Sequence, residues 1–305
     1  MKAFFEKLFF EPKWYHWGVS IVLLPLSIVY GSYMCLRRLL RAKIRFSIPI
    51  VSVGNMIVGG SGKTPFVVAL ASRYDDVFVI SRGYGRQTQG LMQVSSKGKI
   101  LTSVTQSGDE AMMMAEALKN ASVIVSEKRD IAIELAMREG AKLIILDDGF
   151  NRIEIEKYEV LLEPKIIHNY LPFPSGPFRG FWFEKRHADL VLKEGEDFTR
   201  EVSYRNLQDR MLLVTAISNP KRLESYLPQG VVAKKVYDDH AYFNEEELIG
   251  FMQEYEVKSL LVTDKDAVKM EEFQLPLSKM QLKLHIENRV FEEIENYIKG
   301  YRDER

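Results

Sequence analysis

The segment VSVGNMIVGGSGKTP, from Val51 to Pro65, decides the fold of this chain. Apolar residues from Ile48 to Val53 predict a buried strand, and those from Phe66 to Leu70 predict a helix. A glycine-rich loop joins the two. Strand, glycine-rich loop and helix in this order are typical of a phosphate-binding loop, in which backbone N–H groups and the helix dipole hold phosphate oxygens.

The loop has the groups needed to bind a nucleoside triphosphate. We expect the ammonium of Lys63 to contact phosphate oxygens and the hydroxyl of Thr64 to reach Mg²⁺. The strict pattern has glycine where this chain has Ile57, so the sequence predicts a variant loop, and an ordinary glycine-rich turn is the alternative. The residues expected to hold the nucleotide are Gly59, Gly60, Ser61, Gly62, Lys63 and Thr64.

Length and composition indicate a folded protein with two lobes. The chain has 305 residues, of which 46% are apolar and 28% charged. Basic and acidic residues number 42 each, so no overall charge favours nucleic-acid binding. The single cysteine, Cys35, excludes an intramolecular disulfide and a zinc site built from cysteines. Nothing in the sequence indicates an obligate protein partner.

The N-terminal segment, residues 1–45, is predicted to associate with a membrane. Trp17 to Leu36 contains no charged residue, and a helix of that length would reach about 30 Å. Pro25 and two glycines make it a poor span, so we expect it to lie in the membrane interface, with a true span and a buried helix of a soluble protein as alternatives. An anionic cytoplasmic leaflet would attract the basic residues that follow, Arg37, Arg38, Arg41, Lys43 and Arg45.

Alternating apolar strands and helices after the loop predict an α/β fold with a parallel sheet. Asp109 and Glu110 open one of these helices, where acids are ordinary N-terminal caps. A buried strand ending at Leu146 leads into Asp147 and Asp148. Paired aspartates at a strand end, downstream of a phosphate loop, are a common Mg²⁺ site in P-loop enzymes, with a turn cap as the alternative.

A second α/β lobe is expected after a polar connector, Asn151 to Glu159. The PSGPFRG loop holds Arg179 outside regular structure, and His240 follows two aspartates in a strand-to-helix turn, which makes it a candidate for a functional rather than a structural histidine. Strand-like runs of this lobe are Asp189 to Leu192, Met211 to Thr215, Gly230 to Val236 and Ser259 to Thr263. We expect three parts: residues 1–45, a nucleotide-binding domain at 46–155, and the second lobe at 156–305, whose last helix can pack back on the first domain.

Eight motifs, taken in order, resemble those of the tetraacyldisaccharide 4′-kinase (lipid A 4′-kinase) family over nearly the whole chain. They are VGNMIVGGSGKTP, SRGYGR, SGDE, DDGF, PSGPFRG, AISNP, DDHAYF and TDKDAVK. The resemblance implies a P-loop NTPase-like fold and a kinase that uses ATP and Mg²⁺. Its acceptor would be the 4′-hydroxyl of a tetraacylated glucosamine disaccharide 1-phosphate in lipid A biosynthesis. The resemblance places the reaction at the cytoplasmic face of the bacterial inner membrane, with a peripheral or monotopic attachment.

The resemblance also implies roles for single residues. Asp109 is similar to the carboxylate that accepts the sugar hydroxyl proton, and His240 to the residue that orients it from the other lobe, so that lobe closure would assemble the pair. The other implied roles are a β/γ-phosphate ligand (Lys63), a phosphate or substrate clamp (Arg179) and metal ligands (Thr64, Glu110, Asp147 and Asp148).

Two departures from the family pattern stand out. Asn151 and Arg152 follow DDGF where the family commonly has Gln-His, which puts any role of that pair in doubt, and Asp264 stands where glutamate is usual.

Two other functions fit parts of the sequence. A regulatory GTPase needs [NT]-K-x-D after a strand, but the nearest segment, Thr263 to Asp266, has an acid in the place of the lysine. A membrane-bound scaffold with a degenerate nucleotide loop would explain Ile57 but leaves the acids at 109, 147 and 148 without a role.

Overall fold

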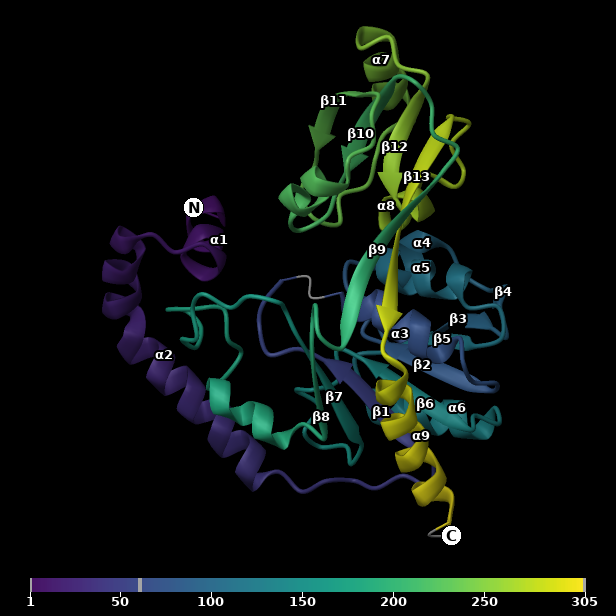
Figure 1. Cartoon of the computed structure of the whole chain (residues 1–305). Coiled ribbons are helices and arrows are strands. Elements are labelled where there is room, and N and C mark those ends of the chain that lie inside the picture. The colour runs from purple at the N-terminus through teal and green to yellow at the C-terminus, as the bar shows by residue number, and fades with distance from the viewer. Residues whose placement is uncertain (1, 60–61, 304–305) are drawn as a thin grey trace. The chain divides into compact units, whose positions relative to one another are not determined.

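The computed structural model describes residues 2–59 and 62–303 (Figure 1). The chain divides into two compact units, and neither is continuous in sequence. The first contains residues 1–63, 143–199 and 286–305, and the second contains residues 64–142 and 200–285. The domain boundaries expected at residues 45 and 155 stay a prediction.

The first unit contains a four-stranded parallel segment of sheet. Its strands, in spatial order, are β6 (Leu143–Asp147), β1 (Ile50–Gly54), β7 (Tyr158–Glu163) and β8 (Leu190–Lys193). Every residue of β1 and β6 is buried, which explains why both are continuous apolar runs instead of alternating ones. The carboxyl ends of β1 and β6 lead into the glycine-rich loop and the paired aspartates.

The prediction that the strand near residues 189–192 belongs to the second lobe's sheet was wrong. This strand, β8, pairs with β7 of the first unit, with Val160 opposite Leu190. The polar connector expected to reach Glu159 also ends earlier, because β7 begins at Tyr158. The sequence analysis did not predict this strand because Glu159, a carboxylate that is buried in the structure, interrupts its apolar residues.

The helices of the first unit include α1 (Lys2–Phe10), α2 (Trp14–Leu40) and α9 (Asn288–Asp303), together with the 3-10 helix η1 (Trp182–His187). By length and composition, α2 could cross a membrane. Its buried face carries His16, Ser20, Ser27 and Gly31, whereas Val22 on its outer face is 77% exposed. A helix that turns small and polar residues inward does not resemble the core helix of a soluble protein.

A network of serines fastens α2 to the PSGPFRG loop. The hydroxyl of Ser20 donates to the carbonyl of Ser175 at 2.9 Å, and the Ser175 hydroxyl donates to the Ser20 carbonyl at 2.8 Å. The backbone N–H of Ser175 donates to the Ser27 hydroxyl at 2.9 Å. One turn farther along, Gly31 lies against the Phe181 ring so closely that a Cβ would sit 2.8 Å from it.

The second unit contains two sheets. The first has the order β4 (Lys99–Ile100), β3 (Met92–Ser96), β5 (Ser122–Val125) and β2 (Val77–Ser81); β2 and β5 are parallel, and β3 is antiparallel to its neighbours. Its helices are α3 (Lys63–Ala71), which begins at the last residue of the first unit, α4 (Val104–Ser107), α5 (Asp109–Ala117) and α6 (Arg129–Arg138). The second sheet has the order β11 (Val231–Val236), β10 (Met211–Thr215), β12 (Ser259–Thr263), β13 (Leu277–Ile286) and β9 (Phe198–Arg205).

Short helices surround the second sheet. They are η2 (Pro220–Tyr226), α7 (Glu245–Glu254), α8 (Asp264–Ala267) and η3 (Val268–Met270). The predicted strands at Met211–Thr215 and Ser259–Thr263 are confirmed, since both are fully or almost fully buried apolar runs. The sequence did not predict β9 and β13, because their burial is partial and charged residues interrupt them.

Candidate active site

The glycine-rich loop leaves β1 with the backbone that a phosphate loop requires. Gly59 and Gly62 have φ angles of +95° and +80°, which side-chain-bearing residues rarely adopt. Lys63 is the first residue of α3, so its backbone N–H group lies at the N-terminus of a helix. The two remaining predicted loop residues, Gly60 and Ser61, lie outside the described residues.

Ile57 is accommodated by the core. Its side chain is 6% exposed and packs in a cluster with Met56, Phe150, Leu161 and Phe178. Its backbone forms a β-bridge with Phe178 of the PSGPFRG loop. The variant position therefore joins the phosphate loop to the segment that carries Arg179.

Arg179 and Lys63 converge on one carboxylate in the first unit. The Arg179 N–H donates to the Met56 carbonyl at 2.7 Å, and its guanidinium Nη1 lies 3.1 Å from Asp148 Oδ2. The Lys63 ammonium lies 3.5 Å from Asp148 Oδ1 and donates to Asn55 Oδ1 at 3.0 Å. Burial alone would raise the pKa of Asp148, but Lys63 and Arg179 outweigh it and lower the pKa below its ordinary value.

This cationic pair has the geometry of an anion site. A guanidinium and an ammonium that share one carboxylate can share phosphate oxygens in the same way. Asp147 is the last residue of β6 and is buried. The next residue, Asp148, has a φ of +52°. The sequence-predicted set of Lys63, Asp148 and Arg179 is thus brought together within one unit.

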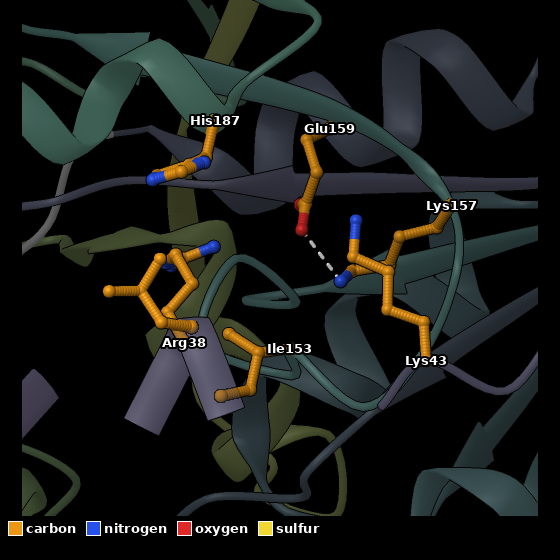
Figure 2. Close-up of a pocket in the computed structure, with 7 residues that line it drawn as sticks. Arg38, Lys43, Ile153, Lys157, Glu159 and His187 are labelled. Carbon is orange, nitrogen blue, oxygen red and sulfur yellow. Dashed lines mark ion pairs between the residues drawn. The ribbon is translucent and has the colours of Figure 1, made fainter. Parts of the chain in front are cut away.

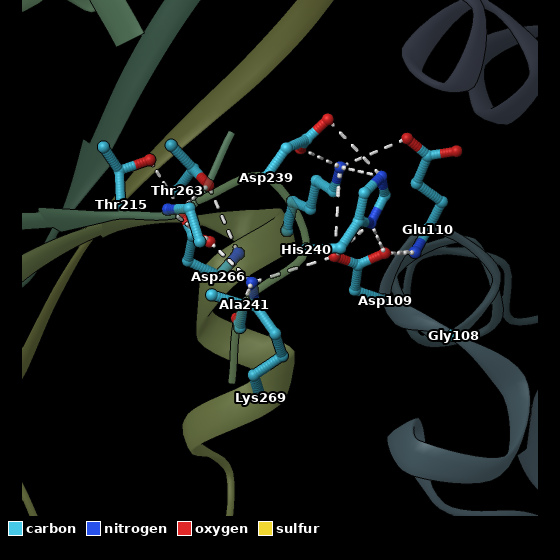
Figure 3. Close-up of polar contacts among 12 residues, drawn as sticks. Gly108, Asp109, Glu110, Thr215, Asp239, His240, Ala241, Thr263, Asp266 and Lys269 are labelled. Atoms are coloured by element: carbon cyan, nitrogen blue, oxygen red, sulfur yellow. Dashed lines mark hydrogen bonds and ion pairs between the residues drawn. The ribbon is translucent and has the colours of Figure 1, made fainter. Parts of the chain in front are cut away.

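Asp109 and His240 form a hydrogen-bonded pair in the second unit (Figure 3). Nδ1 of His240 lies 2.9 Å and 3.0 Å from the two carboxylate oxygens of Asp109. Asp109 opens α5 after Gly108, whose φ is +87° and whose absent Cβ would lie 2.7 Å from the Tyr84 carbonyl. The Tyr84 ring also packs 4.8 Å from the imidazole, so the SRGYGR segment supports the pair.

The expectation that lobe closure assembles this pair was wrong. Asp109 and His240 belong to the same unit and already bond to each other. The sequence suggested two lobes because 131 residues separate Asp109 from His240. The second unit, however, combines residues 64–142 with residues 200–285, and so contains both.

Two lysines of the TDKDAVK motif complete the cluster, and the sequence did not assign them a role. Lys265 Nζ lies 3.8 Å from Asp109 Oδ2, 3.3 Å from Glu110 Oε1 and 3.5 Å from Asp239 Oδ1. Lys269 Nζ lies 3.7 Å from Asp109 Oδ2. Their four-residue spacing was the signal, because it places both on one helical face.

Asp266 holds this arrangement from behind. Its carboxylate is fully buried, pairs with Lys269 at 3.0 Å and accepts hydrogen bonds from the hydroxyls of Thr215 and Thr263, both at 2.8 Å. The N–H of Ala216 donates to it as well, at 3.1 Å. Asp266 thereby links the AISNP segment to α8 and η3, the consecutive helical segments that carry Lys265 and Lys269.

The electrostatics of the cluster favour an ionised Asp109. Burial would raise the pKa of Asp109, but the hydrogen bond to His240 and the charges of Lys265 and Lys269 lower it below its ordinary value. Burial likewise would lower the pKa of Lys265, and Glu110, Asp109 and Asp239 raise it. Asp109 is therefore suited to accept a proton.

The predicted metal ligands lie in both units: Asp147 and Asp148 in the first, Thr64 and Glu110 in the second. Among the described residues, no three acids, histidines or cysteines form a group that could hold a metal ion. Mg²⁺ in nucleotide sites commonly takes only one or two carboxylates and completes its shell with phosphates and water. The hard carboxylate oxygens present here fit that chemistry, and the metal roles remain predictions.

Comparison with known proteins identifies the relatives of this chain. A family model described as "Tetraacyldisaccharide-1-P 4'-kinase" matches residues 19–208 and 198–299. A tetraacyldisaccharide 4′-kinase of Helicobacter pylori is 46% identical over 302 residues, which cover 98% of this chain and 96% of that protein. The protein of that name from Campylobacter jejuni is 38% identical over 97% of this chain and 96% of its own length.

A solved structure shares the fold. The crystal structure of LpxK from Aquifex aeolicus, described as a complex with ATP, matches with a TM-score of 0.76 and 25% identity over 93% of this chain and 99% of that one. This likeness confirms the predicted fold class, an α/β fold with a P-loop NTPase-like sheet, a second α/β lobe and an N-terminal apolar helix.

Proposed function

Because the chain belongs to the tetraacyldisaccharide-1-P 4′-kinase family, we propose that it transfers the γ-phosphate of ATP to the 4′-hydroxyl of a tetraacyldisaccharide 1-phosphate. The observation that carries the assignment of residues is the contact between Asp109 and His240 at 2.9 Å, with two lysines beside it. Phosphoryl transfer depends mainly on positioning and charge neutralisation, and both are supported by these contacts.

On the acceptor side, Asp109 hydrogen-bonds the attacking hydroxyl and takes its proton. Its lowered pKa keeps it ionised at neutral pH, and the imidazole of His240 fixes the direction of its carboxylate. Lys265 and Lys269 balance the negative charge of the carboxylate inside a largely buried cluster.

On the donor side, Lys63 and Arg179 bind the transferring phosphoryl group. Both side chains contact the carboxylate of Asp148 in this structure. Phosphate oxygens would take the place of that carboxylate as acceptors for the same N–H donors. Neutralising the charge of the phosphoryl oxygens as the bond to the leaving group breaks is the main contribution of such cations. The relative solved with ATP supports this choice of nucleotide.

In the first unit, Asp147 and Asp148 are the residues that would hold Mg²⁺, and Thr64 and Glu110 of the second unit stay predicted ligands. When bound, the ion supplies charge neutralisation at the nucleotide phosphates. A tetraacylated substrate carries four apolar acyl chains, so we place it in a membrane, and the exposed apolar face of α2 supports attachment there. We place the enzyme at the cytoplasmic face of the bacterial inner membrane, where ATP is available.

The GTPase alternative is disfavoured by the contacts of the TDKD segment. A guanine-reading aspartate must present its carboxylate to the base, whereas Asp266 is fully buried and binds Thr215, Thr263 and Lys269. A scaffold without catalysis leaves the buried Asp109 cluster without a purpose.

The direct test is incubation with γ-labelled ATP, Mg²⁺ and a tetraacyldisaccharide 1-phosphate in detergent. We expect Asp109→Asn, which keeps the size of the side chain, to lower kcat by on the order of 10²–10⁴, the usual contribution of a positioned acid or base. The KM for ATP should change little, because Asp109 is assigned to the acceptor. Lys63→Ala should instead weaken ATP binding. An Asp109→Asn enzyme with full activity would overturn the assignment.

A further inference from the structure

The first helix of the chain, α1, reaches the phosphate loop. Its last residue, Phe10, places its ring against Gly59, where an added Cβ would lie 3.4 Å from Cζ and 3.9 Å from Cε2 of that ring. The same ring packs on the buried cluster that contains Ile57 and Phe178. The family model matches this chain from residue 19 onward, so the family match does not account for the contact between α1 and the loop.

Gly59 is the point at which the loop needs such a contact. Up to Val58 the loop is held by the PSGPFRG loop, since the Val58 N–H donates to the Pro177 carbonyl at 2.9 Å. Gly59 has a φ of +95° and, as a glycine, has more backbone freedom than a residue with a side chain. The Phe10 ring therefore meets the loop at the residue whose conformation is intrinsically least restricted.

Buried contacts fix α1 in the first unit. Leu8 is fully buried, and its carbonyl accepts a hydrogen bond at 3.2 Å from the side-chain amide of Asn169. The same amide is also fully buried and donates to the Ser175 carbonyl at 3.0 Å. Phe9 is 8% exposed and packs edge-on against Phe173, with ring centroids 6.3 Å apart. Contacts on two consecutive residues therefore set the position of the end of α1.

The other end of the N-terminal segment contacts the same buried cluster. Arg38, in the last turn of α2, lines the cavity drawn in Figure 2, where Glu159 pairs with Lys157 at 2.6 Å. The guanidinium of Arg38 also stacks over the Phe150 ring at 4.5 Å, and Phe150 belongs to the cluster that Phe10 packs on. The helices α1 and α2 therefore both support the cluster beneath the phosphate loop.

We propose that Phe10 is a positioning residue for nucleotide binding, whose ring holds Gly59 in the conformation in which the loop binds phosphate. The role rests on the proposed function, because that function requires the loop to bind ATP. A loop that is already ordered loses less conformational entropy when ATP binds, so its affinity for ATP is higher. The N-terminal segment would then contribute to the nucleotide site as well as to membrane attachment.

Phe5 and Phe10 provide a matched comparison. Both are half-buried phenylalanines of α1, and their ring centroids lie 6.0 Å and 6.3 Å from that of Phe9. Apart from the chain neighbours of Gly59, only Phe10 among the described residues has atoms within 4 Å of the position that a Cβ of Gly59 would take. Phe5→Ala and Phe10→Ala therefore remove the same side chain from the same helix, and Phe10→Leu keeps part of its volume.

The experiment measures the Kd for ATP with Mg²⁺ in detergent, without lipid substrate. We expect Phe10→Ala to raise this Kd about tenfold, as for ordering one more loop residue on binding, and Phe10→Leu to raise it roughly threefold. Phe5→Ala should leave it unchanged. In the transfer assay, the loss should appear in the KM for ATP more than in kcat.

Thermal unfolding shows which variants are folded at the temperature of the measurement. If Phe10→Ala is not folded, the Kd of Phe10→Leu decides in its place. An unchanged ATP affinity in the folded Phe10 variants, or an equal loss in Phe5→Ala, would overturn the role given to Phe10.

Hydrogen exchange without ATP measures the order of the loop directly. The backbone amides from Asn55 to Gly59 should exchange faster in Phe10→Ala than in the native chain, and at the native rate in Phe5→Ala. Unchanged exchange of these amides in the folded Phe10 variants would equally overturn the inference. A native chain that binds ATP but transfers no phosphate would contradict the proposed kinase function, and the Kd values of the variants would still decide the role of Phe10.

Discussion

At the scale of single residues, Lys269 has the largest structural consequence in the candidate active site. Its side chain is 1% exposed and is shared between Asp266, Asp109 and the carbonyl of Ala241. Its ammonium also lies 4.7 Å from the centre of the Phe243 ring. Removing it would leave Asp266 fully buried without its counter-ion.

We therefore expect Lys269→Met to lower the free energy of unfolding by about 3–5 kcal/mol, the usual cost of breaking a buried ion pair from one side. Lys265→Met is the matched control, since that lysine is on the same helical face but is 15% exposed. It should cost much less stability and still lower kcat. Urea unfolding of both variants tests this, and equal, small losses of stability would contradict the role given to Lys269.

The residues that sequence alone assigned to the site were those with strong local signals. Lys63 follows a glycine-rich loop and Asp148 follows a buried apolar strand, so chain-local patterns placed these two, whereas the role of Arg179 came from the family resemblance. Lys265 and Lys269 were missed as site residues because a lysine pair in a short helix is ordinarily a solvated face. Only the fold shows that this face meets Asp109.

At the scale of elements, α9 is fastened to β1 by tyrosine. The Tyr297 hydroxyl donates to the carbonyl of Ile50 at 3.2 Å, and its ring stacks on Tyr158 with centroids 4.8 Å apart. Burial raises the pKa of Tyr297 to about 12 and that of Tyr158 to about 12. The neutral phenols therefore stabilise the fold fully below pH 10, the ordinary tyrosine pKa, and this contribution is lost as the pH rises toward 12.

We expect Tyr297→Phe to cost about 0.5–1.5 kcal/mol of unfolding free energy at pH 8, the usual worth of one hydrogen bond. The difference between the native chain and the variant should shrink as the pH is raised above 10, because ionised Tyr297 no longer contributes. Tyr33→Phe, at a position 62% exposed, is the control and should change neither value. Urea titrations across this pH range decide the matter, and a difference that grows with pH would refute the argument.

The predictions of strands were incorrect or incomplete where the pairing of strands, and not the apolar pattern of the sequence, decides the structure. The short run around residues 189–192 was correctly expected to be a strand, but its partner could not be known, since apolar periodicity does not specify which sheet a strand joins. In the same way, β13 and β9 are held by neighbours distant in sequence and have weak signals of their own.

At the scale of the whole molecule, the outer face of α2 is predicted to hold the protein on a membrane. Val22 and Val29 are 77% and 68% exposed, while the inner face is fastened by the serine network. The double substitution Val22→Glu and Val29→Glu should preserve the fold but lower vesicle binding roughly tenfold or more, since each acid is costly to bury in hydrocarbon. Ile131→Glu with Leu207→Glu adds the same charge to exposed sites elsewhere and should have little effect. Unchanged sedimentation of the first variant with vesicles would count against attachment through this face.

The isoleucine at position 57 has a consequence for how related sequences are interpreted. A sequence search that requires glycine at this position would reject this loop as a phosphate-binding loop. In the structure, however, Ile57 joins the phosphate loop to the PSGPFRG loop, since its backbone pairs with Phe178 and its side chain packs in the same buried cluster. Ile57→Gly would keep the backbone bridge to Phe178 but would remove the buried side chain that packs against the loop carrying Arg179. At position 57 of this protein, a match to the strict glycine pattern and a packed core beneath the phosphate loop therefore require different residues.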